Sequence, residues 1–361
     1  MDHQTPRREF LKTLTFTTIG LAATNQLESA VFDNPRGKIS DFAKSLKPVG
    51  RILETRDYYV WCNSPIYYHD GKVHVFYSRW PEKYGMGGWI HKCEIAHAVA
   101  DSPESNFEFV ETVLKPRQGY FDATTCHNPT IHFVDGKYCL FYMGNSNGKT
   151  NTKRIGLATA DSLFGPWNIM DQPLLEAGHE GSWDDHCTTN PAFIKHPNGE
   201  YWLYYKSWNT NEYEMSKGQK IRANRKYGLA IAKDLFGPYE KFDQNPIIDF
   251  SSSGGNTQLE DAYVWMENDK FKLIARDMGF FDHNVGLYFE SADGLHWPSP
   301  EIAYYSMDNY ATEPPAPKNL TRYGRLERPQ LLMKNGTPEY LFTTSQGGKY
   351  MTASGFVLKI Q

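Results

Sequence analysis

The chain has 361 residues, with 38 basic and 42 acidic side chains and a formal net charge of −4. Its length allows a sizeable core, its 40% hydrophobic content is typical of a globular protein, and the balanced charge gives no support for nucleic-acid binding. No apolar run reaches the roughly 18 residues that span a bilayer. Aromatic residues make up 15%, and together with 29 Gly and 21 Pro they indicate many short strands joined by tight turns.

The first thirty residues have the pattern of an export signal. The pair Arg7 and Arg8 precedes a modest apolar stretch over 14–23, and small residues follow it. This order resembles a twin-arginine signal, which we favour over a short basic helix of a cytosolic protein. We therefore expect 1–30 to be a signal peptide, 31–48 to be a lead-in segment, and the mature protein to be periplasmic or secreted.

The cysteines indicate neither a disulfide framework nor a zinc site. Their number is odd and no Cys-x-x-Cys pair occurs, so we expect small buried side chains in strands. Cys62 and Cys126 are expected to occupy equivalent positions in their strands, next to the axis of the fold. The five are Cys62, Cys93, Cys126, Cys139 and Cys187.

A pattern of about 66 residues recurs five times after position 48. Each copy has an opening tripeptide, a tight turn, an aromatic strand and a strand rich in small residues. The opening tripeptides are Asn63-Ser64-Pro65, His127-Asn128-Pro129, Thr189-Asn190-Pro191, Glu260-Asp261-Ala262 and Glu327-Arg328-Pro329. The turns that follow them are Asp70-Gly71-Lys72, Asp135-Gly136-Lys137, Asn198-Gly199-Glu200, Asn268-Asp269-Lys270 and Asn335-Gly336-Thr337. Such turns are strong hairpin signals, because they accept the positive φ angles that a tight hairpin needs.

Five units of four short antiparallel strands predict an all-β, five-bladed β-propeller over 49–361. The second strands are expected at 73–80, 138–145, 201–208, 271–278 and 338–345, and the third strands at 94–100, 154–160, 227–233, 285–292 and 350–359. The last unit ends soon after its third strand, so an N-terminal strand around 50–55 is expected to close the ring. A β-sandwich would not need a fivefold period. One short helix is expected over 39–46, and Trp61 is expected in the core.

Polar side chains gather where this fold would place a binding site. The hairpin turns all lie on one face of the ring, so segments that lead into the first strands and out of the second strands meet on the other face. The candidates there are Asp57, Arg79, Trp80, Asp122, His127, Asn128, Asp184, Asp185, Lys206, Glu260, Glu327 and Arg328. Carboxylates suit acid–base work on a sugar, tryptophans suit stacking, and cations suit hydroxyl groups or an acidic substituent.

Some of these candidates also have a structural interpretation. We favour a structural bracket for Asn128 and Asn190, because Asn-Pro recurs at one place in the repeat, and an aspartate before a strand often forms a turn. For Lys206, a ligand contact and an ion pair remain equal alternatives. Glu260 and Glu327 are harder to explain structurally, since a carboxylate beside an axial strand is expensive to bury.

The repeats resemble those of the furanosidase superfamily, notably glycoside hydrolase families 43, 32 and 117. The resemblance covers roughly 50–361 and is carried by the fivefold repeat, by Asp161-Ser-Leu-Phe-Gly-Pro-Trp167 and by its copy at 234–239. It implies three acting carboxylates: an aspartate in the first blade, a second aspartate in a middle blade, and a glutamate as general acid.

Glu260 matches the general acid by its register in the fourth blade. The first-blade aspartate falls at Ser64 and the third-blade position at Asn190, and neither residue is an acid. The missing acid must then come from another loop, and its candidates are Asp57, Asp122 and Asp184. We expect Asp122 or Asp184 to hold the attacking water or tune the acid.

Burial and the neighbouring Asp261 are expected to raise the pKa of Glu260. An inverting reaction needs two carboxyl groups roughly 6.5–9.5 Å apart, so one candidate aspartate should lie at about that distance from Glu260. Substrate positioning is assigned to Asp57, Arg79, Trp80, His127, Asn128, Asp185, Lys206, Glu327 and Arg328.

The sequence thus predicts an exported, exo-acting and inverting glycoside hydrolase whose partner is an oligosaccharide. A non-catalytic carbohydrate-binding propeller remains an alternative, because Ser64 and Asn190 are not acids. A glycoside phosphorylase is a third, with Arg79, Arg276 and Arg328 as a phosphate pocket. No cofactor is expected and no metal ligands are assigned, although the resemblance allows a structural divalent cation on the axis.

Overall fold

The computed structural model describes residues 37–219, 222–253 and 257–361. The expected signal peptide over 1–30 lies outside the described residues. The short helix expected over 39–46 is α1 (Asp41–Ser45), and it begins where Ser40 Oγ accepts a hydrogen bond from the Ala43 backbone N–H at 3.0 Å. No helix in the described part of the chain is long and apolar enough to cross a membrane.

The described strands form five sheets, each with four antiparallel strands. We number the five sheets as blades in chain order. Blade 1 contains β2 (Tyr58–Tyr67), β3 (Val73–Pro81), β4 (Glu94–Ala100) and β5 (Glu108–Leu114). Blade 2 contains β6 (Thr125–Val134), β7 (Lys137–Asn145), β8 (Lys153–Ala160) and β9 (Asn168–Ile169). Blade 3 contains β10 (Thr189–Lys195), β11 (Tyr201–Ser207), β12 (Lys226–Ala232) and β13 (Glu240–Lys241).

The last two blades complete the expected fivefold repeat. Blade 4 contains β14 (Leu259–Glu267), β15 (Lys270–Asp277), β16 (Gly286–Ser291) and β17 (Glu301–Tyr304). Blade 5 contains β18 (Glu327–Lys334), β19 (Thr337–Gly347), β20 (Thr352–Ile360) and β1 (Leu46–Leu53). The remaining helices are short: η1 (Glu82–Tyr84), η2 (Met86–Ile90), η3 (Thr150–Thr152), α2 (Thr210–Met215), η4 (Ser251–Ser253) and η5 (Met307–Asn309).

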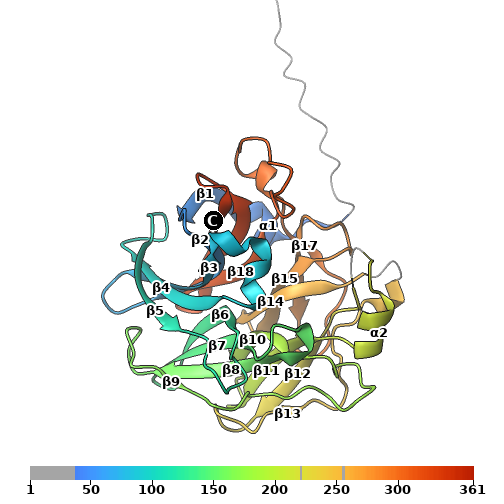
Figure 1. Cartoon of the computed structure of the whole chain (residues 1–361). Helices are drawn as coiled ribbons and strands as arrows, with labels where there is room; N and C mark the ends of the chain where they lie inside the picture. Colours follow the sequence, from blue (N-terminus) through green and yellow to red (C-terminus); the bar gives the residue numbers. More distant parts are fainter. Residues whose placement is uncertain (1–36, 220–221, 254–256) are drawn as a thin grey trace, which may run out of the picture. The chain divides into compact units, whose positions relative to one another are not determined.

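The N-terminal strand supplies the outer strand of the last blade, as the short final repeat predicted. In Figure 1 the blue β1 lies beside the red C-terminal strands, and its residues pair antiparallel with β20. The strand begins at Leu46, earlier than the expected 50–55 and before the domain start expected at 49, because Leu46 already pairs with Ile360.

The hydrophobic core is divided among the contacts between neighbouring blades. One buried cluster joins blades 1 and 2, and further clusters join blades 2 and 3, blades 3 and 4, and blades 4 and 5. A fifth cluster joins blade 5 back to blade 1, where Phe342 and Val357 pack with Val75 and Val60. Each sheet therefore buries both faces against neighbours, which is how five small sheets form one closed ring.

Each innermost strand carries a β-bulge at the same register. The bulged residue has a positive φ, between 49° and 62°, and the pairing with the second strand shifts there. The five bulged residues are Cys62, Asn128, Asn190, Asp261 and Arg328. A bulge re-aims side chains, and here it directs one residue per blade toward the axis.

The bulges correct the sequence alignment of blade 1. Cys62, and not Ser64, takes the place that Asn128 holds in blade 2. The expected shared register of Cys62 and Cys126 is therefore wrong. The error arose because the Asn-x-Pro pattern of blade 1 lies two residues later in its strand than the equivalent patterns of the other blades, and a bulge position is not visible in hydrophobic periodicity.

Candidate functional site

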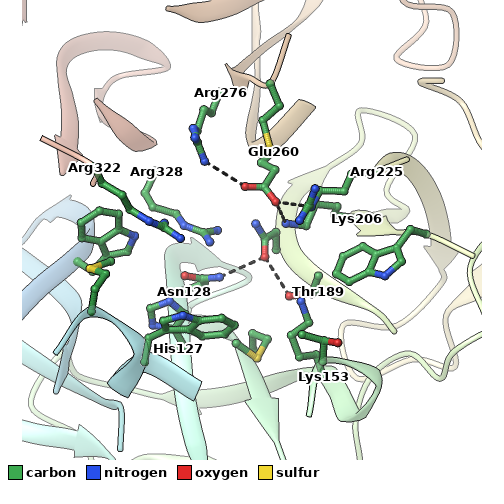
Figure 2. A pocket seen from close by; sticks show the side chains of 18 of the residues that line it. His127, Asn128, Lys153, Thr189, Lys206, Arg225, Glu260, Arg276, Arg322 and Arg328 are labelled. Carbon is green, nitrogen blue, oxygen red and sulfur yellow. Dashed lines mark hydrogen bonds and ion pairs between the residues drawn. The ribbon is translucent and has the colours of Figure 1, made fainter. Parts of the chain in front are cut away.

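A cavity of about 300 Å³ opens where the first strands begin and the second strands end. This is the face that the hairpin topology predicted, and Figure 2 shows side chains from several blades pointing into it. The residues just before the bulges in blades 1 to 4 line it: Trp61, His127, Thr189 and Glu260. Ends of second strands contribute Trp80, Lys206 and Arg276.

The bulged side chains meet across the axis and form the floor of the cavity. Asn128 Nδ2 donates to Asn190 Oδ1 at 3.1 Å, and Asn190 Nδ2 donates to Asp261 Oδ1 at 2.6 Å. Arg328 continues the chain, with its guanidinium 2.5 Å from the Asp261 carboxylate. Burial raises the pKa of the Asp261 carboxyl, although Arg328 opposes this shift. Each side chain is held by its neighbours, so the floor is rigid.

The floor does not fit a divalent cation on the axis. It offers one carboxylate, Asp261, which already pairs with Arg328, whereas a hard cation requires several oxygen ligands. Over the described ranges, no three His, Cys, Asp or Glu side chains are grouped so as to hold a metal ion.

Glu260 is the carboxylate on the cavity wall, and three cations hold it (Figure 2). Lys206 Nζ donates to Oε1 at 2.8 Å, Arg225 Nε lies 2.6 Å from Oε1, and Arg276 donates to Oε2 at 3.2 Å. Burial acts to raise the pKa of Glu260, but these cations outweigh it and hold the pKa well below its usual value. The expected raised pKa is therefore wrong, because the cations that contact Glu260 lie on other strands and are not visible in its local sequence.

Arg276 joins Glu260 to a second carboxylate. One terminal nitrogen of its guanidinium contacts Glu260 and the other lies 3.3 Å from Glu327 Oε1. Glu327 also accepts a hydrogen bond from Arg322 at 3.0 Å and is only 1% exposed. The pKa of Glu327 is lowered, since Arg276 and Arg322 outweigh the effect of burial. Glu327 is thus not among the lining residues and instead orients two arginines that are.

Positive charge dominates the lining. Its one carboxylate is Glu260, whereas seven cationic side chains line the same cavity: Lys153, Lys206, Arg225, Arg276, Arg322, Arg325 and Arg328. Asp261 in the floor and Glu327 behind the wall bring the carboxylates to three, which is still fewer than the seven cations. Such an excess in a partly enclosed site favours a ligand that carries negative charge.

Aromatic side chains form the remaining wall. Trp61, Trp80, Trp89 and Trp208 all line the cavity. His127 stacks on Trp89 with ring centroids 5.4 Å apart, and burial together with nearby cations keeps its pKa well below the usual value. The imidazole is therefore neutral, and of the four tryptophans only Trp89 is partly exposed, so it is the ring with a free flat surface for a sugar.

The structure brings together half of the predicted site residues. Those that line the cavity are Trp80, His127, Asn128, Lys206, Glu260 and Arg328. Those that are not part of its lining are Asp57, Arg79, Asp122, Asp184, Asp185 and Glu327. The sequence left two alternative roles for Lys206, a ligand contact and an ion pair. In the structure Lys206 lines the cavity and also pairs with Glu260.

Asp122 and Asp184 are equivalent structural carboxylates of blades 2 and 3. Each accepts a hydrogen bond from a tyrosine of its second strand, at 2.8 Å for Asp122 and 2.9 Å for Asp184. Arg117 pairs with Asp122 at 3.0 Å, and Lys241 pairs with Asp184 at 2.6 Å. The catalytic roles expected for both aspartates are not supported by their placement, because these partners fix them away from the cavity wall.

The other three candidates serve local structure. Asp57 is exposed, and Asp185 accepts hydrogen bonds from the backbone N–H groups of Gly181 and Thr210 at 2.9 and 2.6 Å. Arg79 pairs with Glu94 at 2.8 Å. The phosphate pocket expected from Arg79, Arg276 and Arg328 is therefore not assembled as predicted.

Several residues that line the cavity were not predicted from the sequence to belong to the site. Trp61 was assigned to the core, and Lys153, Arg225 and Arg322 were not singled out. A third strand begins on the face where the second strand ends, so Lys153 at the start of β8 and Arg225 just before β12 had to lie on the cavity side. The hairpin topology already contained this signal.

Comparison with known proteins agrees with this architecture. No protein-family model matches the sequence. A curated relative, the probable arabinan endo-1,5-alpha-L-arabinosidase C of Neosartorya fischeri, is 26% identical over 265 residues, which are 68% of this chain and 64% of the relative. The match therefore spans less than two thirds of that protein.

Solved structures resemble the chain over most of its length. A family 117 glycoside hydrolase of the marine bacterium Zobellia galactanivorans has a TM-score of 0.62 at 18% identity, covering 87% of this chain and 90% of its own. A family 43 β-xylosidase/α-arabinofuranosidase from a compost microbial metagenome has a TM-score of 0.56 at 18% identity, covering 91% and 95%. Fructan 1-exohydrolase IIa of Cichorium intybus has a TM-score of 0.60 at 15% identity, covering 85% and 56%. The chain therefore has the five-bladed β-propeller fold of glycoside hydrolase families 43, 117 and 32.

Proposed function

We propose that the chain is an exported, exo-acting glycoside hydrolase that removes a terminal sugar from an oligosaccharide in the axial cavity. The observation that carries this proposal is the convergence of a carboxylate, Glu260, with tryptophan side chains in the lining of one axial cavity of a five-bladed propeller. Relatives of this fold include enzymes named for hydrolysis of arabinan, xylosides and fructan.

The shape of the cavity favours action at a chain end. Its volume of about 300 Å³ is at the lower end of the range for small-molecule sites, and the axial side chains close its floor. A small closed cavity accepts one or two sugar units, whereas cleavage inside a polymer needs a groove open at both ends.

Glu260 is the side chain that acts on the glycosidic bond in this proposal. Glycoside hydrolysis uses carboxyl groups to protonate the leaving oxygen, to activate water or to stabilise an oxocarbenium-like transition state. The surrounding cations keep Glu260 ionised, which suits the second and third of these tasks. It becomes a proton donor only where a bound ligand weakens its contacts with the cations.

A digestion panel tests the hydrolase assignment. Purified protein is incubated with arabinan, xylan, fructan and algal oligosaccharides, with and without inorganic phosphate, and the released sugars are separated by chromatography. We expect monosaccharides from the chain ends, at a rate that does not depend on phosphate. Oligomeric products would contradict exo action, a phosphate requirement would indicate a phosphorylase, and binding without turnover would indicate a carbohydrate-binding propeller.

A further inference from the structure

We propose that the sugar removed by this protein carries an anionic substituent, a carboxylate or a sulfate ester, and that Lys153, Lys206 and Arg225 bind this substituent beside Trp208. The inference rests on the proposed glycoside hydrolase function and specifies its substrate class. We call these four residues the Trp208 wall; Figure 2 labels the three cations on one side of the cavity.

The Trp208 wall is assembled from three strands of two blades. Lys153 begins β8 of blade 2, while Lys206 ends β11 and Arg225 precedes β12 in blade 3. Their charged groups lie 4.3, 5.7 and 5.4 Å from the centroid of a Trp208 ring. Three cations around one buried indole form a desolvated cluster, in which an anion interacts more strongly than it does in water.

Among the described residues, Lys153 is the member of this wall without an ion-pair or hydrogen-bond partner for its ammonium group. Its side chain is buried, with 6% of the residue exposed, and it faces the cavity. Within 37–219, 222–253 and 257–361 its Nζ makes no hydrogen bond and no ion pair. It lies over the Trp208 indole, 4.3 Å from a ring centroid. A buried ammonium without a counter-ion is costly, so its retention is explained by an anion that arrives with the ligand.

The neighbouring cations are only partly compensated. Lys206 and Arg225 share the single Oε1 atom of Glu260, and the other oxygen of that carboxylate contacts Arg276. The Trp208 wall therefore holds three basic side chains against one carboxylate, which it also shares with Arg276. A neutral sugar would leave this excess in place, whereas one carboxylate or sulfate group would reduce it.

Binding of an anion here also changes Glu260. A negative charge near Lys206 and Arg225 competes for the cations that keep Glu260 ionised, and like charges raise the pKa of a carboxyl group. An anionic substrate would thus move Glu260 toward the protonated form that a general acid requires. The same substituent that binds the Trp208 wall would prepare the carboxylate for proton transfer to the leaving oxygen.

The test measures binding separately from turnover. Isothermal titration calorimetry compares three monosaccharides that the enzyme cannot cleave: a uronic acid, a sulfated sugar and their neutral parent. We expect at least one anionic sugar to bind ten-fold or more tightly than the neutral one. Lys153→Gln should abolish this preference and Lys153→Arg should largely keep it. The matched control Lys149→Gln removes an exposed charge four positions away, outside the lining, and should leave binding unchanged.

The outcomes separate this inference from the hydrolase assignment. Equal binding of neutral and anionic sugars, or a preference that survives Lys153→Gln, would overturn the inference even if neutral oligosaccharides are hydrolysed. Inorganic phosphate or sulfate binding as tightly as the anionic sugars would also overturn it, because the occupant would then be a free anion. Preferential binding of anionic sugars without any glycoside turnover would refute the hydrolase and leave the Trp208 wall as a binding site for anionic sugars.

Discussion

Glu260 and Lys153 acquire their properties from residues that are distant in the sequence. Glu260 stays ionised because Lys206, Arg225 and Arg276 surround it, and Lys153 has a pKa lowered to about 7 because it is buried. Glu260 contacts three cations, whereas Lys153 has no ion-pair partner among the described residues. Both lie on the same cavity wall, so a ligand that redistributes these contacts would change both groups together.

At the level of single residues, the affinity for anionic sugars should depend on pH. The charged fraction of Lys153 falls as pH rises through about 7, so the Kd of an anionic sugar should increase there, and Lys153→Arg should flatten the profile. The measurement is calorimetric titration between pH 5.5 and 8.5, a window of about three pH units around the pKa.

The groups that face Lys153 leave the direction of this effect unchanged. Burial raises the pKa of Cys187 and lowers that of His186 to about 4, so both are neutral across the window. Cations hold the pKa of Glu260 well below its usual value, so it stays ionised, and Lys206, whose pKa burial also lowers, would lose charge in the same direction. A Kd that stays constant or falls as pH rises would contradict the role of Lys153.

At the level of elements, the closure of the ring depends on how β1 is held. Arg51 of β1 pairs with Glu313 through two nitrogens, at 2.6 and 2.8 Å, and also donates to Ser354 Oγ and the Ser345 carbonyl at 2.5 and 3.1 Å. Only 8% of the Arg51 side chain is exposed. This single side chain connects the N-terminal strand with two strands of the C-terminal sheet.

Removing that connection should destabilise the whole protein. Arg51→Met leaves the Glu313 carboxylate, 13% exposed, without its partner and removes the bonds to Ser345 and Ser354, and we expect a loss of about 2–4 kcal/mol in the free energy of unfolding. The control Arg56→Met removes an exposed arginine that lies over the Tyr350 ring, and should cost about 1 kcal/mol or less. Guanidinium unfolding measures both values. Equal losses in the two variants would show that β1 does not secure the ring.

The elements were largely predictable from the sequence, and the bulges within them were not. Hairpin turns such as Asp135-Gly136 and Asn335-Gly336 mark strand ends directly, so β7 and β19 were located closely. Bulged residues such as Cys62 and Arg328 have positive φ values without the Gly or Asn that usually announces them. Their conformation is imposed by packing around the axis, which a local pattern does not contain.

At the level of the whole molecule, the repeat predicted the ring and the face that holds the site, but not which side chains meet there. Glu260 and His127 were found because they lie in the opening tripeptides. Asp122 and Asp184 were misassigned, because a recurring aspartate before a strand can equally brace a tyrosine of its own blade. The positions of Lys153 and Arg225 followed from the topology, but the excess of cations depends on how side chains from four blades meet, which the repeat does not show.

The central claim is that the axial cavity cleaves glycosidic bonds through Glu260. The most direct measurement compares the turnover of an accepted oligosaccharide by the wild type, Glu260→Gln and Glu267→Gln, after circular dichroism has confirmed that all three fold. Glu267 ends the same strand and also pairs with a lysine, but it lies outside the cavity lining. We predict a loss of about 100-fold or more for Glu260→Gln and near-wild-type turnover for Glu267→Gln. Full activity of Glu260→Gln, or equal losses in both variants, would contradict the claim.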